Sequence, residues 1–161
     1  MAKPGPAGSW DGGVVVPGHG LVNLPDHRTG MLVEGSPYPH KHPRPAGLGA
    51  LGWAWWPQDR LVALRADEMG SFALFPLIFE GRTVHLNVNT TFAGHVLVEA
   101  VGTDGEVLPG RSFADCDIIS GDNLDQKVSW GGETDLGHND GDPVTLRFRM
   151  RTAELYSVKF V

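Results

Sequence analysis

Three of the five tryptophans lie close together, in the run Gly52-Trp53-Ala54-Trp55-Trp56-Pro57. Side chains alternate between the two faces of an extended strand, so Trp53 and Trp55 share one face and Trp56 lies on the other. The negative face of an aromatic ring attracts the polarised C–H groups of a sugar ring, and large aromatic side chains also fill ordinary cores. We predict a sugar-stacking platform formed by Trp53 and Trp55 with Tyr38, and a purely structural cluster is the alternative.

Three polar side chains are candidates for hydrogen bonds to a sugar beside this platform. His40 lies in a proline-rich loop two residues after Tyr38. His85 and Asn87 belong to the alternating run 83–89, whose pattern places them on the face opposite to its valines and leucine. The predicted carbohydrate-binding residues are therefore Trp53, Trp55, Tyr38, His40, His85 and Asn87.

Histidines supply a possible metal site, because His40 and His42 share one side of an extended loop. Zinc or copper sites use three or four converging ligands, and His19 or His27 would have to supply the third. Lys41 places a positive charge between the first two. We therefore favour solvated loop histidines and predict no metal at this place.

An acidic stretch supplies a second possible metal site. Oxygen ligands at this density are typical of calcium sites, but the spacing departs from the EF-hand pattern because Gly121 comes one place late and no Glu closes the loop. A solvated turn with local Asp capping is favoured, so no cofactor is predicted, with structural calcium as the alternative. The four acids are Asp115, Asp117, Asp122 and Asp125.

No catalytic residue can be assigned from the sequence. The Gly-x-Ser-x-Gly elbow of many hydrolases is absent. Cys116 lies between Asp115 and Asp117, whose like charge disfavours its thiolate. A glycosidase needs two carboxyl groups roughly 5–9.5 Å apart, and the spacing of the 19 acidic residues singles out no pair.

Composition excludes several classes of partner. The 19 acidic and 13 basic residues give a net charge of −6, which argues against nucleic acid and anionic membranes. No apolar run approaches the roughly 20 residues that cross a bilayer. The first residues lack the apolar stretch of a signal peptide, which predicts a cytoplasmic chain as expressed. The single cysteine excludes an intrachain disulfide and leaves the native compartment open.

The elements that must position these residues are short strands. Apolar and polar residues alternate in 83–89, 95–101, 144–150 and 156–160, and Asp104-Gly105 supplies a hairpin turn. Segment 59–69 fits a helix or a strand, and its surroundings favour a strand. We predict an all-β fold: an antiparallel β-sandwich of the jelly-roll kind, preceded by an irregular Pro/Gly-rich segment with short strands.

The predicted organisation is a flexible leader over residues 1–12 and a single β-sandwich domain over 13–161. Within that domain, 14–56 contains short apolar bursts divided by turns, and 57–161 is the regular sandwich. Residues 35–45 contain four prolines and are predicted to form an extended surface loop.

Several motifs resemble bacterial proteins related to family 32 glycoside hydrolases, the invertase and fructosidase group. Pro17-Gly18-His19-Gly20 and Pro39-His40-Lys41 are similar to the segment that leaves the family's propeller. Similarity to its C-terminal β-sandwich runs from Trp53 to Val161. The motifs that carry it are Trp56-Pro57 with Asp59-Arg60-Leu61-Val62-Ala63-Leu64, Phe113-Ala114-Asp115-Cys116-Asp117, and Pro143-Val144-Thr145-Leu146-Arg147-Phe148.

The resemblance implies an accessory module without the family's active site. The family's three acidic motifs are missing: Asp142-Pro143 follows Gly141, and Cys116 follows Asp115 where the family has Glu. We therefore predict a carbohydrate-binding or accessory module of a glycoside hydrolase, with an oligo- or polysaccharide as partner. The alternatives are a compact glycan-cleaving hydrolase that uses its own carboxylates, and a structural sandwich that pairs with itself as a homo-oligomer or with another chain. The glycan, the linkage and the oligomeric state are left open.

Overall fold

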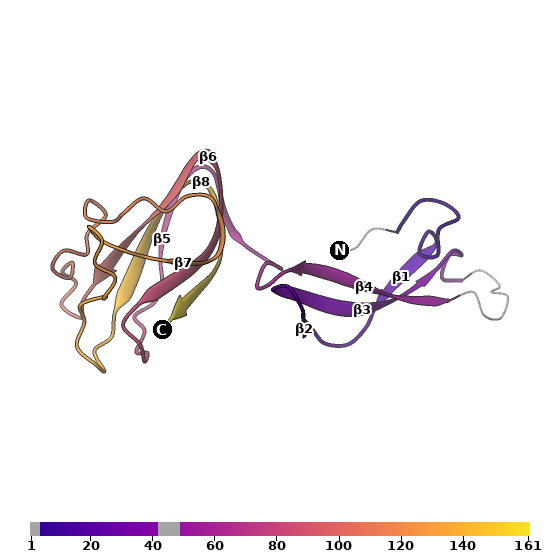
Figure 1. The fold of residues 1–161 in the computed structure, drawn as a ribbon, viewed down its shortest axis with the longest axis horizontal. Coiled ribbons are helices and arrows are strands. Elements are labelled where there is room, and N and C mark those ends of the chain that lie inside the picture. The colour runs from indigo at the N-terminus through magenta and orange to yellow at the C-terminus, as the bar shows by residue number, and fades with distance from the viewer. Residues whose placement is uncertain (1–3, 42–48) are drawn as a thin grey trace. The chain divides into compact units, whose positions relative to one another are not determined.

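The computed structural model describes residues 4–41 and 49–161, and these residues form antiparallel sheets without a helix (Figure 1). The predicted all-β, sandwich-like fold is confirmed. The chain divides into two compact units, Met1–Asp59 and Arg60–Val161, here called unit 1 and unit 2. The division falls close to the 56/57 boundary of the sequence prediction. The four strands between Val14 and Pro57 build a sheet of their own, so the predicted domain over 13–161 contains two separate sheets. None of the described residues belongs to a helix that is long and apolar enough to span a membrane.

Unit 1 is one antiparallel sheet organised around its longest strand. Strand β3 pairs with β4 along one edge, and on the other edge β1 pairs with its end and β2 with its beginning. Asp26 and His27 have positive φ in the turn between β2 and β3, and Asp tolerates that conformation better than most residues. The four strands are β1 (Val14–Pro17), β2 (Val22–Leu24), β3 (Arg28–Ser36) and β4 (Ala50–Pro57).

Trp10 covers part of one face of this sheet. Its ring lies against Gly35 on β3 and Gly52 on β4, where any side chain would collide with it. The amide of Gly13 donates to the carbonyl of Ser36. These contacts hold the chain near Trp10 against the sheet, within the segment for which we predicted a flexible leader.

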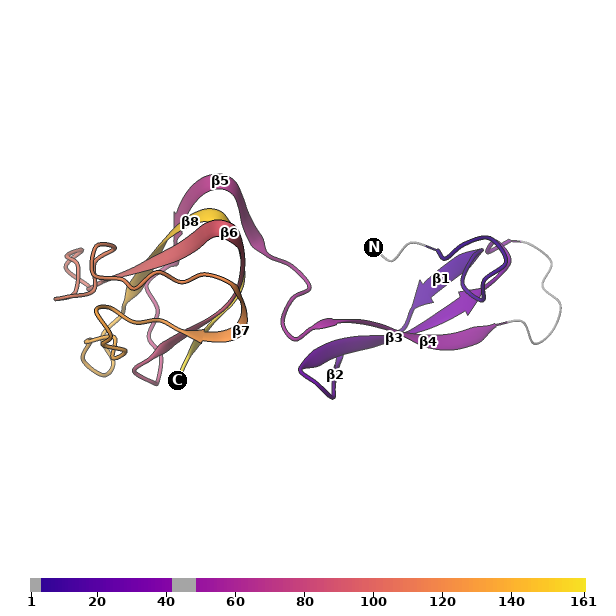
Figure 2. The same ribbon diagram turned by 45° about the horizontal axis from the view of Figure 1, so that its top comes forward.

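Unit 2 is a second antiparallel sheet with strand order β5-β8-β6-β7. Three of its strands change register at the same level, at Ala66/Met69, at Thr90/His95 and around Thr152, which has a φ of 39°. The sheet bends sharply at this level, so its two halves face each other (Figure 2). The strands are β5 (Leu64–Ala73), β6 (Val84–Val101), β7 (Asp122–Lys127) and β8 (Thr145–Phe160).

The predicted strands 83–89 and 95–101 are two halves of the single strand β6, because the chain bends between them without reversing. Segment 59–69 contributes the first part of β5, so the strand was the correct alternative. The Asp104-Gly105 turn is confirmed: Gly105 has a φ of 83° and donates its amide to the carbonyl of Gly102.

The core of unit 2 lies between the two halves of the bent sheet. Inward-facing residues of β6 and β8 alternate with exposed ones, as their sequence pattern predicts. Phe148 is fully buried and stacks on Phe72 with ring centroids 4.7 Å apart. The largest fully buried side chains are Phe148, Leu86, Leu136, Leu146, Val84, Val88, Val96, Val98, Val128 and Val144.

Candidate functional site

Trp53 and Trp55 lie on one face of the unit 1 sheet, 52% and 53% exposed. Across the sheet, Trp53 is opposite Leu32 and Trp55 is opposite Gly30. Directly opposed residues point to the same side, so these tryptophans share their face with aliphatic side chains from all four strands. We call this surface the aromatic face, and its apolar members are Val16, Val22, Leu32, Leu51, Trp53 and Trp55.

Local contacts fix the two indole rings. A Cβ at Gly30 would collide with Leu24 and lie 3.3 Å from the Trp53 ring, so glycine lets these side chains close over the strand. The Arg28 guanidinium lies 4.8 Å from the centroid of the Trp55 ring, where cation and ring attract each other. Trp56 is on the opposite face of β4 and is half-buried. The predicted sharing of one face by Trp53 and Trp55 is confirmed.

Unit 1 has almost no hydrophobic core of its own. Among the described residues, Val33 is its single buried hydrophobic side chain, and Thr29 and Ser36 are its buried polar ones. All other buried hydrophobic side chains belong to unit 2. The six apolar side chains of the aromatic face are 42–71% exposed, so the described residues of unit 1 leave this face largely uncovered.

Tyr38 and His40 lie away from the two tryptophans. Both follow the end of β3, where the Tyr38 amide donates to Ser36 Oγ at 3.2 Å. Gly30, opposite Trp55, is six residues before Ser36 on the same strand, a separation of roughly 20 Å at about 3.3 Å per residue. The structure does not bring these residues into one platform with Trp55. His42, the second histidine of the predicted loop pair, lies outside the described residues.

His85 and Asn87 belong to unit 2, and both are engaged within it. His85 Nδ1 lies 3.1 Å from Asp125 Oδ1, and its Nε2 lies 3.2 Å from Thr83 Oγ1. Asn87 is 3% exposed, and its Oδ1 accepts a 2.8 Å hydrogen bond from Arg60 Nε. Their contacts stabilise the sheet of unit 2 and leave the Asn87 side chain inaccessible to a sugar.

Arg60 is a buried cation whose guanidinium contacts several partners, and the sequence pattern did not indicate this role. Its side chain is 8% exposed and lies 4.8 Å from the centroid of the Tyr156 ring. Besides Asn87, it donates to the Val88 carbonyl at 3.1 Å and pairs with Asp122 at 2.6 Å. The register shift of β6 between Asn87 and Val88 takes that carbonyl out of the regular ladder. Arg60 thus anchors the start of unit 2 to β6 and β7.

The acids of the predicted calcium stretch are distributed over separate partners. Asp115 accepts from Ser112 Oγ at 2.6 Å, and Asp117 accepts from Ser129 Oγ at 2.6 Å and from the Gly132 amide at 2.8 Å. These hydrogen bonds lower the pKa of both carboxyl groups and confirm the local capping. Asp122 and Asp125 pair instead with Arg60 and His85, so no three metal-ligating side chains converge in residues 4–41 and 49–161.

Cys116 is a buried thiol, 8% exposed, whose Sγ accepts the Val98 amide at 3.3 Å. Burial raises its pKa, and the charge of Asp117 adds a smaller effect in the same direction. The predicted disfavoured thiolate is therefore confirmed, with burial as its main cause. Such a thiol packs as a small hydrophobic residue.

We expect Cys116 to react with a thiol reagent such as dithionitrobenzoate only when unit 2 opens. In native buffer at pH 8 labelling should be at least about a hundredfold slower than in denaturant, because the thiolate is both scarce and covered. Rapid stoichiometric labelling of the native chain would contradict this burial. Free cysteine in the same buffer is the control for reagent activity.

Three of the described acids, Glu99, Glu154 and Asp135, are engaged by neighbouring side chains. Glu99 is 9% exposed, but its carboxylate pairs with Arg147 at 3.2 Å. Glu154 accepts the Tyr156 hydroxyl at 2.6 Å. Asp135 receives two bonds from Arg82, at 2.6 and 2.9 Å, which lower the pKa of that carboxyl. These acids serve as partners of neighbouring side chains.

Comparison with known proteins leaves the family of the chain undetermined. No family model, no curated protein and no solved structure matches it. The resemblance to the sandwich of family 32 glycoside hydrolases rests on the sequence motifs and stays a prediction. The function is therefore inferred from the surfaces of the two units.

Proposed function

We propose that this chain is a non-catalytic structural subunit that pairs with a second copy of itself through the aromatic face of unit 1. The observation that supports this proposal is the distribution of buried residues. Among the residues of unit 1 that the structure describes, one hydrophobic side chain, Val33, is buried, while six lie exposed together on one face. A sheet with this pattern gains its missing core when another sheet packs on it, at a spacing of about 10 Å.

The size of the aromatic face suits a small dimer interface. At 42–71% exposure its six apolar side chains present on the order of 600 Å² to solvent. A standard stable interface covers about 800 Å² on each partner. The polar side chains around the face supply the remainder.

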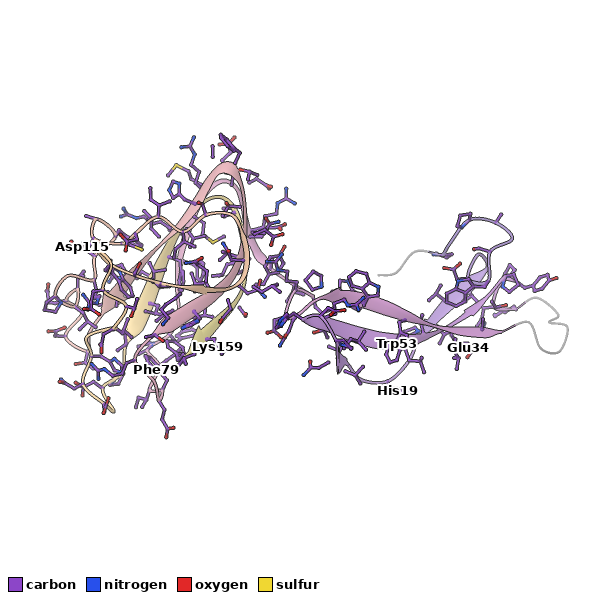
Figure 3. The ribbon with its side chains drawn as sticks, in the orientation of Figure 1. His19, Glu34, Trp53, Phe79, Asp115 and Lys159 are labelled. Carbon is purple, nitrogen blue, oxygen red and sulfur yellow. The ribbon has the colours of Figure 1, made fainter. Side chains whose placement is uncertain are left out.

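Charges on this face are arranged for pairing about a two-fold axis. Arg28 and Glu34 lie six residues apart on β3, so both are on the side of Trp53 and Leu32 (Figure 3 labels Glu34 and Trp53). A two-fold axis perpendicular to β3 and midway between these residues places Arg28 of one copy opposite Glu34 of the other. Opposite charges then meet at both ends of β3, which favours antiparallel over parallel packing of the two copies of this strand.

The test is the effect of the Leu51→Glu substitution on the mass of the assembly in solution. Leu51 is 71% exposed, so the substitution leaves the folding of a single chain intact but buries a charge in the proposed interface. Sedimentation equilibrium should show a dimer for the wild type at about 10 µM and at least a hundredfold weaker association for the variant. Phe92→Glu, at a fully exposed position of unit 2, is the matched control and should leave the mass unchanged.

A monomeric wild type at about 100 µM would overturn the proposed pairing. Intramolecular covering of the same face would also give a monomer, and protection of the tryptophans from an aqueous quencher would identify it. Exposed tryptophans on a monomer would favour the second candidate.

The second candidate function is carbohydrate binding by Trp53 and Trp55. These rings lie on the same side of β4 at a strand repeat of about 7 Å, which suits stacking of adjacent sugar units. We expect soluble oligosaccharides to quench the tryptophan fluorescence and Trp53→Ala to abolish retention on insoluble polysaccharide. Tyr38→Ala, two residues beyond the end of β3, is the control and should bind normally. Release of reducing sugar in the same tubes would support the hydrolase alternative.

A further inference from the structure

Strand β8 has no paired strand on its β5 side over residues 156–160. β5 pairs with β8 from Leu64 opposite Leu155 onward, but the preceding residues turn away towards the Arg60 anchor. No described residue forms a backbone ladder with 156–160 on that side of β8. The end of β8 is therefore an open sheet edge, which proteins normally cover or pair.

The backbone of this edge is oriented for another strand. Val161 exchanges both backbone hydrogen bonds with Thr83, the residue immediately before β6. Hydrogen-bonding direction alternates along an antiparallel strand, so the N–H and C=O of Phe160 and Val158 point away from β6. Val158 and Phe160 are opposite Leu86 and Val84, so their side chains point to the core side.

An apolar groove of about 530 Å³ runs beside this edge. One side of the groove is the edge of β8. The rest of its lining comes from residues 62–64, around the start of β5, and from residues that end or follow β5. Phe160 is fixed at one end by its stacking on Phe79, with ring centroids 3.7 Å apart (Figure 3 labels Phe79). The side chains that line the groove include Val62, Leu64, Phe72, Leu74, Leu77 and Val158.

We propose that this groove binds an extended protein segment as an added β-strand, with apolar side chains at every second position. The edge identifies the occupant, because unpaired peptide groups at alternate residues require the peptide groups of a partner strand. Directly opposed residues share a face, so the segment's residues opposite Val158 and Phe160 direct their side chains over Phe72 and Leu74. The segment closes the open side of the sandwich, as in β-strand addition.

The experiment uses the full chain and a capped peptide of the sequence Thr-Val-Thr-Val-Thr-Val-Thr, measured by calorimetry. We expect binding with a dissociation constant of about 10–100 µM. N-methylation of the valine amides should abolish binding, because valines that face the core direct their N–H groups to β8. N-methylation of the threonine amides should change the affinity less than about threefold, because those groups face solvent.

Two protein variants locate the peptide. Leu64→Glu places a charge at the groove and should weaken binding at least about tenfold. Met69→Glu, on the same strand but 81% exposed and outside the groove lining, should bind as the wild type does. The proposal would be overturned if the two N-methylated peptides bound with equal affinity, or if the two protein variants bound the peptide with equal affinity. It would also be overturned if the wild type showed no binding at about 1 mM peptide. These outcomes are independent of dimerisation through unit 1, since they involve residues of unit 2 alone.

Discussion

Replacing Phe148 by alanine is expected to lower the free energy of unfolding of unit 2 by about 4 kcal/mol. The ring is 0% exposed, stacks almost parallel on Phe72 at 4.7 Å and is opposite Val98 across β6 and β8. Alanine removes most of the buried apolar surface of this residue and leaves a cavity between the two sheet halves. Those halves cannot collapse into it, because their separation is fixed by surrounding residues such as Leu146 and Met150.

The measurement is guanidinium unfolding of unit 2, followed by the exposure of Cys116 to a thiol reagent. This probe reports unit 2 alone, whereas four of the five tryptophans lie in unit 1 and would mix the two transitions. Phe92→Ala is the matched control, with the same chemical change at a fully exposed position, and should alter stability by less than about 0.5 kcal/mol. A loss below about 1 kcal/mol for Phe148→Ala would contradict a close-packed core.

Replacing Arg60 by alanine is expected to lower the free energy of unfolding of unit 2 by about 2–3 kcal/mol. The side chain is 8% exposed and satisfies Asn87 Oδ1 and the Val88 carbonyl, which both lose their donor in the variant. A buried acceptor without a donor is costly because water cannot replace the lost bond. Asp122 adds little to the loss, since its carboxylate is 68% exposed and becomes solvated.

Arg65→Ala is the control for this prediction, because that arginine is 66% exposed although it pairs with Asp67 at 2.7 Å. It should change stability by less than about 1 kcal/mol. Arg60→Lys should recover only part of the loss, since one ammonium group cannot donate in all three directions of the guanidinium plane. Equal effects of Arg60→Ala and Arg65→Ala would show that burial of the anchor contributes nothing.

Local patterns in the sequence predicted the faces of the strands correctly. Val84, Leu86 and Val88 are buried as their alternation indicates, and Trp53 and Trp55 share an exposed face. The Asp104-Gly105 turn forms where a glycine with positive φ is available. These features depend on two to four consecutive residues, so a single sequence contains the information for them.

Placement of the candidate site residues depends on contacts between distant segments. The sequence grouped Tyr38, His85 and Asn87 with the tryptophans by chemistry alone. In the structure Tyr38 follows the end of β3 that is far from Trp55, so it does not join the platform. His85 and Asn87 form contacts that stabilise unit 2. The anchoring role of Arg60 could not be predicted, because its partners Asn87 and Val88 are 27 and 28 residues away.

What the sequence by itself determined is the period of each strand and therefore which side chains share a face. Only the tertiary structure decided that strands β1–β4 form a separate sheet, that β6 bends without reversing, and that β5 leaves the end of β8 open. The reason is the range of the interactions. Side-chain alternation follows from the backbone of one strand, whereas register, bending and uncovered edges result from pairing between strands far apart in the chain.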